Sequence, residues 1–206
     1  MWRYFFSTID LADAYLQIMV DEKSKELLTI NTHKGLYQYN RLCFGIKSAP
    51  GIFQQIIDTM LAGLPGVVSY LDDIIIVGKT ESQHKANVIR TLQKIQDWGF
   101  HIKPEKCRFF LTSIKYLGFI IDRNGRRPDP DKINTIVKMP QPTDLTTLRL
   151  FIGMINYYGQ FIKQMRELRA PFDKLLVKDT AFNWSTDCKK SFTKVKQILQ
   201  SDLLSQ

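Results

Sequence analysis

The segment 67–78 places two adjacent carboxylates, Asp72 and Asp73, between two apolar runs rich in β-branched residues. Such runs favour strands, so the segment is predicted to be a tight β-hairpin with the acidic pair at or beside its turn. Neighbouring carboxylates repel each other, and burying them between apolar strands is costly unless a cation neutralises them. Hard oxygen ligands of this kind suit Mg²⁺ or Mn²⁺. The alternative is a solvated Asp-Asp turn without a metal, because Asp is a common turn residue.

A third carboxylate, Asp10, stands where another predicted strand ends. The aromatic and β-branched run that starts at Phe5 predicts this strand, and the chain turns polar at Asp10. Asp10 and Asp72 are 62 positions apart, but strands of one sheet can bring them together. Two divalent ions bridged by carboxylates can activate an attacking hydroxyl and stabilise the leaving oxygen of a phosphoryl displacement. This chemistry would require the three carboxylates to lie close together.

The other segments predict an α+β fold, in which a sheet with helices on one face is followed by helices alone. Further strands are expected at 27–30, 37–42, 109–111 and 116–121, and helices at 48–64 and 81–98. Glycine, two prolines and alternating charge make 122–130 the best boundary candidate, which predicts domains at 1–125 and 126–206.

Four helices are expected in the second domain, at 131–139, 144–163, 167–177 and 186–200. Thr143 or Asp144 can cap the second of them, and Thr186 or Asp187 can cap the last.

The charge of the chain is concentrated in its second half. Residues 1–100 carry 10 basic and 10 acidic side chains, whereas the remainder carries 19 and 10, which gives the net charge of +9. A basic half joined to a neutral half that holds a metal site suits a polyanion held by one part and processed by the other. Three cysteines without CxxC spacing predict neither a disulfide framework nor a zinc site. With no apolar run of membrane-spanning length, an intracellular protein is expected.

The helix expected at 144–163 carries a polar face opposite its apolar stripe. Glycine inside a helix lowers stability by roughly 1 kcal/mol relative to alanine, so Gly153 and Gly159 require a structural or functional explanation. Either another helix packs tightly there, or something large approaches the backbone. Asn, Tyr and Gln side chains surround Gly153, so a nucleic-acid duplex groove is one candidate for that object.

Several motifs, in order, resemble the reverse transcriptase domain of Ty3/gypsy-type long-terminal-repeat retrotransposons. Residues 6–15 are similar to polymerase motif A, 42–54 to motif B, Tyr70-Leu71-Asp72-Asp73 to motif C, 116–119 to the primer grip and 148–161 to the thumb. The resemblance covers essentially the whole chain. It implies a palm with a ferredoxin-like core and a remnant of fingers at 1–125, and an all-helical thumb at 126–206.

The resemblance also implies a catalytic role for the three carboxylates. Asp10, Asp72 and Asp73, helped by the Leu11 carbonyl, would bind two Mg²⁺ ions, or Mn²⁺. These residues would align a primer 3′-hydroxyl against the α-phosphate of an incoming deoxynucleoside triphosphate.

Three sets of binding residues follow from the same resemblance. The nucleotide pocket, in which the Tyr15 ring would exclude a 2′-hydroxyl, is implied for Asp13, Ala14, Tyr15, Phe44 and Gly45. The primer grip is implied for Tyr116, Leu117 and Gly118. Tracking of the minor groove of an RNA or DNA template-primer duplex is implied for Gly153, Asn156, Tyr157 and Gln160.

The chain departs from the family pattern at Cys43, Gly51 and Gly159, where Pro, Ala and Arg are usual. It also begins almost at motif A, without the upstream fingers, and shows nothing similar to the RNase H or integrase modules that accompany such domains.

The leading hypothesis is an RNA-directed DNA polymerase of the cytoplasm, a virus-like particle or the nucleus, with no membrane partner. The alternatives are a catalytically silent nucleic-acid-binding remnant and a purely structural or protein-interaction fragment.

Overall fold

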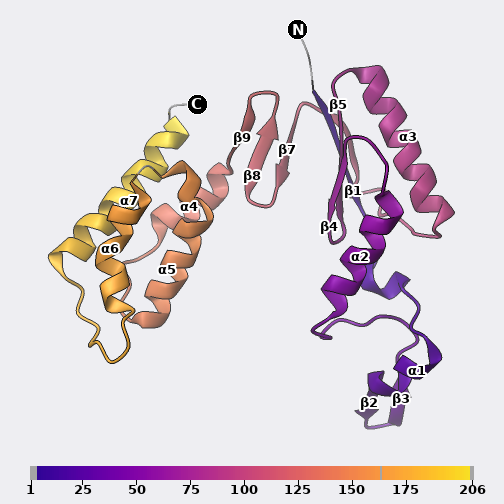
Figure 1. Ribbon diagram of the computed structural model, residues 1–206, viewed down its shortest axis with the longest axis horizontal. Helices are drawn as coiled ribbons and strands as arrows, with labels where there is room; N and C mark the ends of the chain where they lie inside the picture. Colours follow the sequence, from indigo (N-terminus) through magenta and orange to yellow (C-terminus); the bar gives the residue numbers. More distant parts are fainter. Residues whose placement is uncertain (1–3, 163, 205–206) are drawn as a thin grey trace. The chain divides into compact units, whose positions relative to one another are not determined.

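The computed structural model describes residues 4–162 and 164–204 (Figure 1). Its contacts divide the chain into two compact units. The first unit consists of Met1–Ile114 and Ile121–Gly125, and the second of Lys115–Ile120 and Arg126–Gln206. None of the described helices is long and apolar enough to cross a membrane.

A four-stranded sheet with the order β4-β5-β1-β6 organises the first unit. Its strands are β1 (Phe5–Asp10), β4 (Val67–Tyr70), β5 (Asp73–Gly78) and β6 (Arg108–Leu111). Strand β1 pairs antiparallel with both β5 and β6, and β4 pairs antiparallel with β5. The hairpin and the strand ending in Asp10, expected from the sequence, are therefore neighbours in one sheet.

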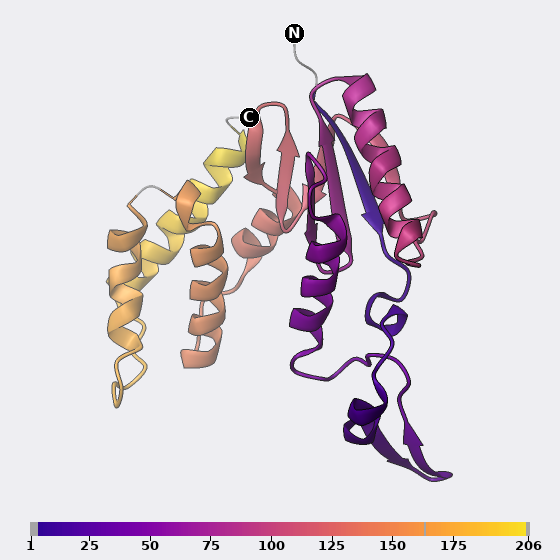
Figure 2. The same ribbon diagram turned by 45° about the vertical axis from the view of Figure 1, so that its right-hand side comes forward.

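Two helices, α2 (Ala49–Leu61) and α3 (Glu81–Asp97), pack against this sheet (Figures 1 and 2). Because side chains alternate along a strand, Ile9 and its ladder partner Ile74 share one face. Both isoleucines are buried in one core with Phe53 of α2 and Ile95 of α3. The prediction of an antiparallel sheet with helices on one face is confirmed.

Helix α3 approaches the sheet so closely that strand β5 ends in a glycine. A Cβ added to Gly78 would lie 2.5 Å from the Cα of His84. The His84 ring is fully buried, and its Nε2 lies 2.7 Å from the Ser7 hydroxyl of β1. Burial lowers the pKa of His84, which keeps the imidazole neutral in this core.

The segment between β1 and α2 differs from the expected strands. A hairpin forms from β2 (Thr29–Thr32) and β3 (Gly35–Gln38), preceded by the short helices η1 (Ala14–Gln17), α1 (Glu22–Lys25) and η2 (Glu26–Leu28). The strands expected at 27–30 and 37–42 are therefore misplaced. The loop between β2 and β3 has only two residues, and Gly35 (φ +114°) is the first residue of β3. Both strands therefore start nearer the turn than the apolar runs indicated.

A three-stranded sheet contributes residues to both units. Its strands, in the order β7-β8-β9, are β7 (Ser113–Tyr116), β8 (Phe119–Asp122) and β9 (Gly125–Pro128). The single strand expected at 116–121 is wrong, because Leu117 (φ +45°) and Gly118 (φ +72°) form a two-residue turn inside it. Positive φ at both turn positions is the geometry that suits the twist of a tight hairpin.

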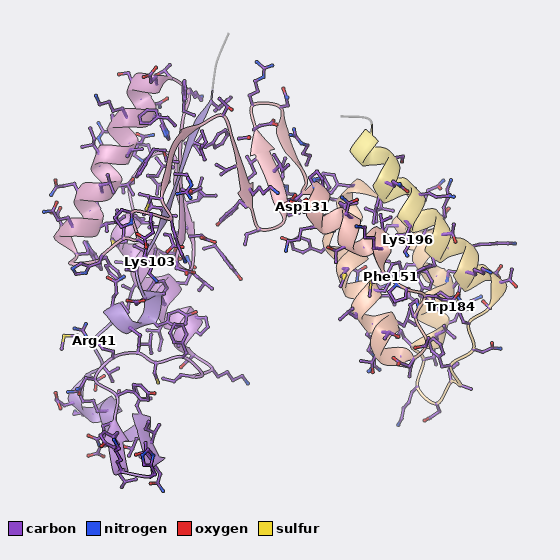
Figure 3. The ribbon with its side chains drawn as sticks, turned by 180° about the vertical axis from the view of Figure 1, so that it is seen from behind. Arg41, Lys103, Asp131, Phe151, Trp184 and Lys196 are labelled. Carbon is purple, nitrogen blue, oxygen red and sulfur yellow. The ribbon has the colours of Figure 1, made fainter. Side chains whose placement is uncertain are left out.

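Helices make up the rest of the second unit, namely α4 (Pro130–Lys138), α5 (Leu145–Tyr157), η3 (Gly159–Phe161), α6 (Met165–Leu175) and α7 (Thr186–Leu204). Their core includes Phe151, whose ring centroid lies 5.7 Å from that of Phe172 and 4.7 Å from that of Phe192. Figure 3 labels Phe151 and Trp184 among these helices.

Two helix ends differ from expectation, while one cap is confirmed. Asp144 caps α5 in a capping box with Thr147. The last helix is capped by neither expected residue, because the Ser185 hydroxyl accepts from the Cys188 N–H at 3.2 Å. Helix α5 ends at Tyr157, where the poor helix former Gly159 follows and opens a 3₁₀ turn. The expected helix end, Lys163, lies outside the described residues.

Gly78→Ala is expected to destabilise the first unit by about 1–3 kcal/mol, because the new methyl group meets the α3 backbone, which cannot move aside cheaply. Urea unfolding measures the change. Gly51→Ala is the matched control, since nothing lies within 4 Å of the added carbon in α2. This control is expected to gain up to roughly 1 kcal/mol. Equal stability of the two variants would contradict the close approach of α3.

Candidate active site

The three carboxylates lie at one end of the β1–β5 pair. Asp10 is the ladder partner of Asp73, and Asp73 is also the partner of Tyr70 across the β4–β5 hairpin. Leu71 and Asp72 form the two-residue turn, with Leu71 in the left-handed region (φ +54°). A bulky residue is rare in this conformation, which costs of order 1–3 kcal/mol, and such residues cluster at functional sites.

Contacts from two other elements hold the turn in place. The Gln54 Oε1 atom of α2 accepts a hydrogen bond from the Leu71 N–H at 2.7 Å. The amide nitrogen of Gln54 donates to the Asp58 carboxylate at 2.8 Å. From the end of β1, the Leu11 N–H donates to the Asp72 carbonyl at 3.2 Å.

The negative charges of this group are only partly balanced. Partial burial raises the pKa of Asp73 above its ordinary value, and the charges of Asp72 and Asp10 raise it further. Lys106 acts in the opposite direction, with its Nζ 3.6 Å from Asp10 Oδ2. Like charges held together without full compensation are common where a protein binds a cation or shifts a pKa for chemistry.

Carboxylate oxygens with an excess of negative charge are the donor set that a hard divalent cation requires. Across residues 4–162 and 164–204, however, no three Asp, Glu, His or Cys side chains are grouped closely enough to hold a metal ion. The ladder opposes Asp10 to Asp73 and the turn adds Asp72, but the three side chains do not converge on one point. The residue types fit Mg²⁺ or Mn²⁺, and the two-metal site stays a prediction.

The residues expected to bind a nucleotide gather beside β1. Asp13 (φ +52°) and Ala14 (φ +33°) turn the chain into η1, which brings the Tyr15 ring centroid to 5.2 Å from that of Phe44. Phe44 is 64% exposed, and Gly45 follows it with φ +94°. Tyr15 and Phe44 thus form an aromatic wall from two segments distant in sequence.

Two lysines at this site were missed by the sequence analysis. Lys103 Nζ lies 3.2 Å from Asp13 Oδ1, and Lys106 pairs with Asp10 (Figure 3 labels Lys103). A bridge between Leu11 and Ile102 carries this segment to the end of β1. No local motif marks the two lysines. They lie beside the carboxylates because their segment pairs with the end of β1, about 90 positions away in the sequence.

The residues of the expected primer grip belong to the second unit, where two tyrosines hold them. Tyr116 ends β7, and the Leu117-Gly118 turn follows. The Tyr157 hydroxyl donates to the Leu117 carbonyl, and the Tyr158 hydroxyl donates to the Gly118 carbonyl at 3.1 Å. A Cβ at Gly118 would lie 2.8 Å from the Tyr158 hydroxyl oxygen, so glycine is needed both for the turn and for this contact.

The four residues expected to track a duplex are all exposed. Nothing lies within 4 Å of a Cβ added at Gly153, so tight helix packing does not explain this glycine. The Asn156 side-chain oxygen accepts from Arg169 at 3.1 Å, and that of Gln160 accepts from Arg126 at 2.7 Å. The structure therefore adds two arginines to this polar face, one from α6 and one from β9.

Residues 3–121 match the family described as reverse transcriptase (RNA-dependent DNA polymerase). The chain belongs to the reverse transcriptase family. It is 32% identical over 204 residues to the retrovirus-related Pol polyprotein from transposon 412 of Drosophila melanogaster, a match that covers 98% of this chain and 16% of that protein. It is 35% identical over 174 residues to the retrovirus-related Pol polyprotein from transposon gypsy of the same species, a match that covers 84% of this chain and 17% of that protein. The predicted likeness to Ty3/gypsy-type reverse transcriptases is confirmed.

Solved structures show the same fold. The foamy viral protease-reverse transcriptase dRH in complex with double-stranded DNA superposes with a TM-score of 0.89 at 20% identity, covering 98% of this chain and 36% of that chain. The foamy viral protease-reverse transcriptase in complex with an RNA/DNA hybrid superposes with a TM-score of 0.84 at 21% identity, covering 95% of this chain and 27% of that chain. The α+β palm followed by a helical thumb is thereby confirmed as the fold. The chain spans only about a sixth of the length of the two polyproteins.

Asp73→Asn is expected to stabilise the palm at pH 7 without divalent ions, because it removes a charge that the fold disfavours. The pKa of Asp73 is raised in the folded protein from an ordinary value near 3.8, so ionisation costs stability above the folded pKa. This cost disappears as the pH falls below about 4, where the carboxyl is protonated in both states. Urea unfolding at pH 7 and pH 3.5 measures the difference.

The control for this comparison is Asp97→Asn, which removes an exposed carboxylate of α3 that accepts a hydrogen bond from Gln93. It is expected to bring no gain at pH 7. A gain in Asp73→Asn that persisted unchanged at pH 3.5 would show that charge repulsion is not its source.

Proposed function

We propose that this chain is the palm and thumb of an RNA-directed DNA polymerase, which transfers a nucleotide from a deoxynucleoside triphosphate to a primer 3′-hydroxyl under the direction of a template. The observation that carries the proposal is the β1–β5 register, which opposes Asp10 to Asp73 beside the Asp72 turn. Membership of the reverse transcriptase family supports the reaction class.

Asp10, Asp72, Asp73 and the Leu11 carbonyl would hold two Mg²⁺ ions, or Mn²⁺, which would stabilise charge on the attacking and leaving oxygens. The protein's own part is to hold the backbone of these residues at one end of the β1–β5 pair before substrate arrives. Gln54 and the β1 backbone fix the hairpin turn, and Lys106 partly offsets the charge of Asp10.

The aromatic wall would select the sugar of the nucleotide. Tyr15 would present its ring to the position of a 2′-hydroxyl and exclude it sterically, while Phe44 and Gly45 would flank the base. The 5.2 Å separation of the Tyr15 and Phe44 rings, and the edge-on support of Tyr15 by Phe53 at 5.1 Å, keep this wall rigid. The ion pair of Asp13 with Lys103 fixes the start of η1.

The thumb would hold the template-primer duplex. Residues 116–118 would hold the primer end, and the exposed face of α5 and η3 would follow the minor groove, where Gly153 leaves room for a close approach. Arg126 keeps donors beyond its bond to Gln160, and guanidinium groups bind phosphates well. Arg169 is also paired with Asp173, with its Nε 2.8 Å from Asp173 Oδ1. Other Pol modules such as RNase H and integrase, and a cytoplasmic, particle or nuclear location, stay predictions.

Asp72→Asn is expected to lower primer extension on a primed RNA template by roughly 100-fold or more, since it removes one charge that stabilises the transition state. Incorporation of deoxynucleotides with Mg²⁺ is the measurement, with Asp97→Asn as the charge-matched control. Equal extension by Asp72→Asn and wild type would rule out the metal mechanism. Salt-sensitive duplex binding without any extension by the wild type would favour the silent nucleic-acid-binding alternative.

A readout independent of turnover tests the metal ligands. Mn²⁺ is expected to raise the thermal unfolding midpoint of the wild type and to have a smaller effect on Asp73→Asn, because ligand binding to the folded state stabilises it. The same rise in both proteins would contradict binding at this site.

Gly153→Ala is expected to stabilise the thumb by about 1 kcal/mol, because it replaces an exposed mid-helix glycine, and yet to weaken duplex binding. Urea unfolding and fluorescence anisotropy of a labelled RNA/DNA duplex measure the two effects. Gly51→Ala makes the same change in an open position of the palm and is expected to leave duplex binding without nucleotide unaltered. Unchanged affinity in Gly153→Ala would remove the case for a close approach at α5.

A further inference from the structure

The Tyr15 ring, which forms the aromatic wall with Phe44, belongs to a short element that needs support from other segments. This element is η1 (Ala14–Gln17), a 3₁₀ helix of four residues. Helices of this kind have poor hydrogen-bond geometry and are rarely longer. The Asp13 side chain makes no cap bond to η1. The position of Tyr15 therefore depends on contacts that η1 makes with other parts of the palm.

Segment 101–103 contacts η1 at both of its ends. This segment pairs with the end of β1, which leads into η1. At the start of η1, Lys103 Nζ lies 3.2 Å from Asp13 Oδ1. At the end of η1, the Gln17 side chain binds the backbone of His101. The ion pair described above is therefore only one of two supports, and Gln17 supplies the other.

The amide of Gln17 extends the backbone pairing between the end of β1 and segment 101–103. Its nitrogen donates to the carbonyls of Ala12 and His101, the second at 3.1 Å. Its oxygen accepts from the His101 N–H at 2.6 Å. A glutamine amide has two donor hydrogens and an acceptor oxygen, so both donors and the acceptor are used here. A side chain without an amide at this position would leave these backbone groups without this partner.

Gln17 also links η1 to the segment that carries Phe44. Arg41 Nη1 donates to the Gln17 carbonyl at 3.0 Å. Figure 3 labels Arg41 and Lys103, which belong to two of the segments that meet η1. The end of β1, residues 101–103 and the residues just before Phe44 are therefore all joined through one glutamine.

We propose that Gln17 is a positioning residue for sugar selection, because it fixes the aromatic wall relative to the strand end that carries Asp10. The proposal rests on the proposed function, in which the Tyr15 ring excludes a 2′-hydroxyl. Gln17 lies outside the segment 6–15 that resembles motif A. Its side chain binds backbone groups, so it acts through the wall and not on the nucleotide. A displacement of about 1 Å in an active site can cost roughly 100-fold in rate.

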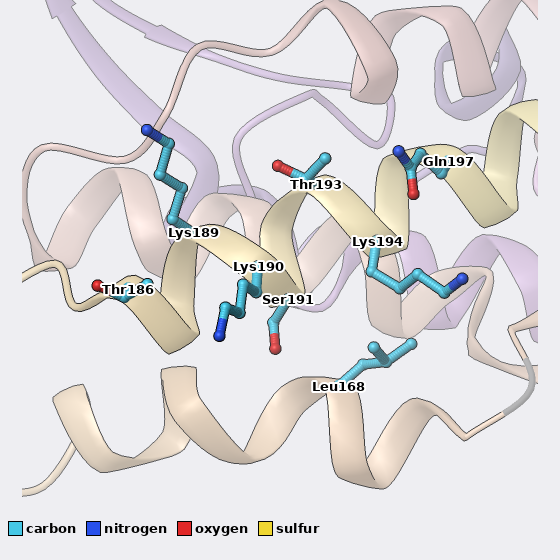
Figure 4. Close-up of a pocket in the computed structure, with 8 residues that line it drawn as sticks. All are labelled: Leu168, Thr186, Lys189, Lys190, Ser191, Thr193, Lys194 and Gln197. Atoms are coloured by element: carbon cyan, nitrogen blue, oxygen red, sulfur yellow. The ribbon is translucent and has the colours of Figure 1, made fainter.

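The test compares Gln17→Ala with two controls in the full chain. Gln93→Ala removes an amide of the palm that donates to Asp97 in the same helix. Gln197→Ala removes an exposed amide of α7 that lines a hollow over α6 and α7 (Figure 4). Thermal unfolding verifies that all three variants fold.

Native-state hydrogen exchange measures local opening and requires no turnover. Exchange within 14–18 and 100–103 is expected to be faster by roughly tenfold or more in Gln17→Ala, because at least two hydrogen bonds of the side chain are lost. Both controls are expected to exchange in these segments as the wild type does. Unaltered exchange within 14–18 in Gln17→Ala would overturn the proposal, since η1 would not depend on this side chain.

The second measurement is the ratio of kcat/KM for a deoxynucleotide to that for the matching ribonucleotide on a primed RNA template, because this ratio defines selectivity. Gln17→Ala is expected to lower the ratio by roughly tenfold or more, since a displaced Tyr15 ring would admit the 2′-hydroxyl. Both controls are expected to keep the ratio of the wild type. A merely destabilised protein would lose active molecules and lower both kcat values equally, which leaves the ratio unchanged.

The two measurements together separate this proposal from the proposed function. Faster exchange in Gln17→Ala with a wild-type ratio would overturn the proposal, because other contacts would then hold the wall. Extension that depends on Asp72, with that same unchanged ratio, would leave the polymerase function standing. No extension by the wild type would remove the proposed function and the selection role of Gln17 with it.

Discussion

The pairing of β1 with β5 is the constraint on which the palm depends. Because side chains alternate along a strand, a slip of one residue would turn Ile9 and Ile74 away from the helices and expose them. The burial of these two isoleucines against α2 and α3 therefore fixes the register. The same register sets Asp10 opposite Asp73, so an apolar core decides where the charged groups of the candidate site lie.

The helices serve this arrangement in different ways. Helix α3 is held close to the sheet by the absence of a side chain at Gly78 and by the buried pair of His84 with Ser7. Helix α2 supports the turn directly through Gln54, which binds the Leu71 N–H. A left-handed leucine and three neighbouring carboxylates are both unfavourable, and the fold keeps them because its apolar contacts and these hydrogen bonds compensate.

The parts predicted correctly from sequence were those fixed by local patterning. Two apolar runs rich in β-branched residues predicted the hairpin around Asp72, and helical spacing with an Asp at its start predicted α5. The strand expected at 116–121 was wrong because the apolar run contains the Leu117-Gly118 turn, which the hydrogen bonds from Tyr157 and Tyr158 stabilise. Lys103 and Lys106 were missed because a pairing between segments distant in the sequence places them beside the site. No motif in the surrounding residues indicates this pairing. The polar face of α5 was predicted, but its two arginines come from other elements.

The two adjacent tyrosines of the thumb have a mechanical consequence. Tyr157 is half exposed on the face expected to follow the duplex, while its hydroxyl binds the Leu117 carbonyl and its ring stacks on Phe119 at 5.3 Å. Tyr158 adds a second bond to the same turn. The end of α5 and the β7–β8 turn are thus linked by two hydrogen bonds and a stacked ring pair, all of which a displacement of one against the other would break. In the proposed polymerase, the side chain that meets the duplex would therefore also support the turn expected to hold the primer end.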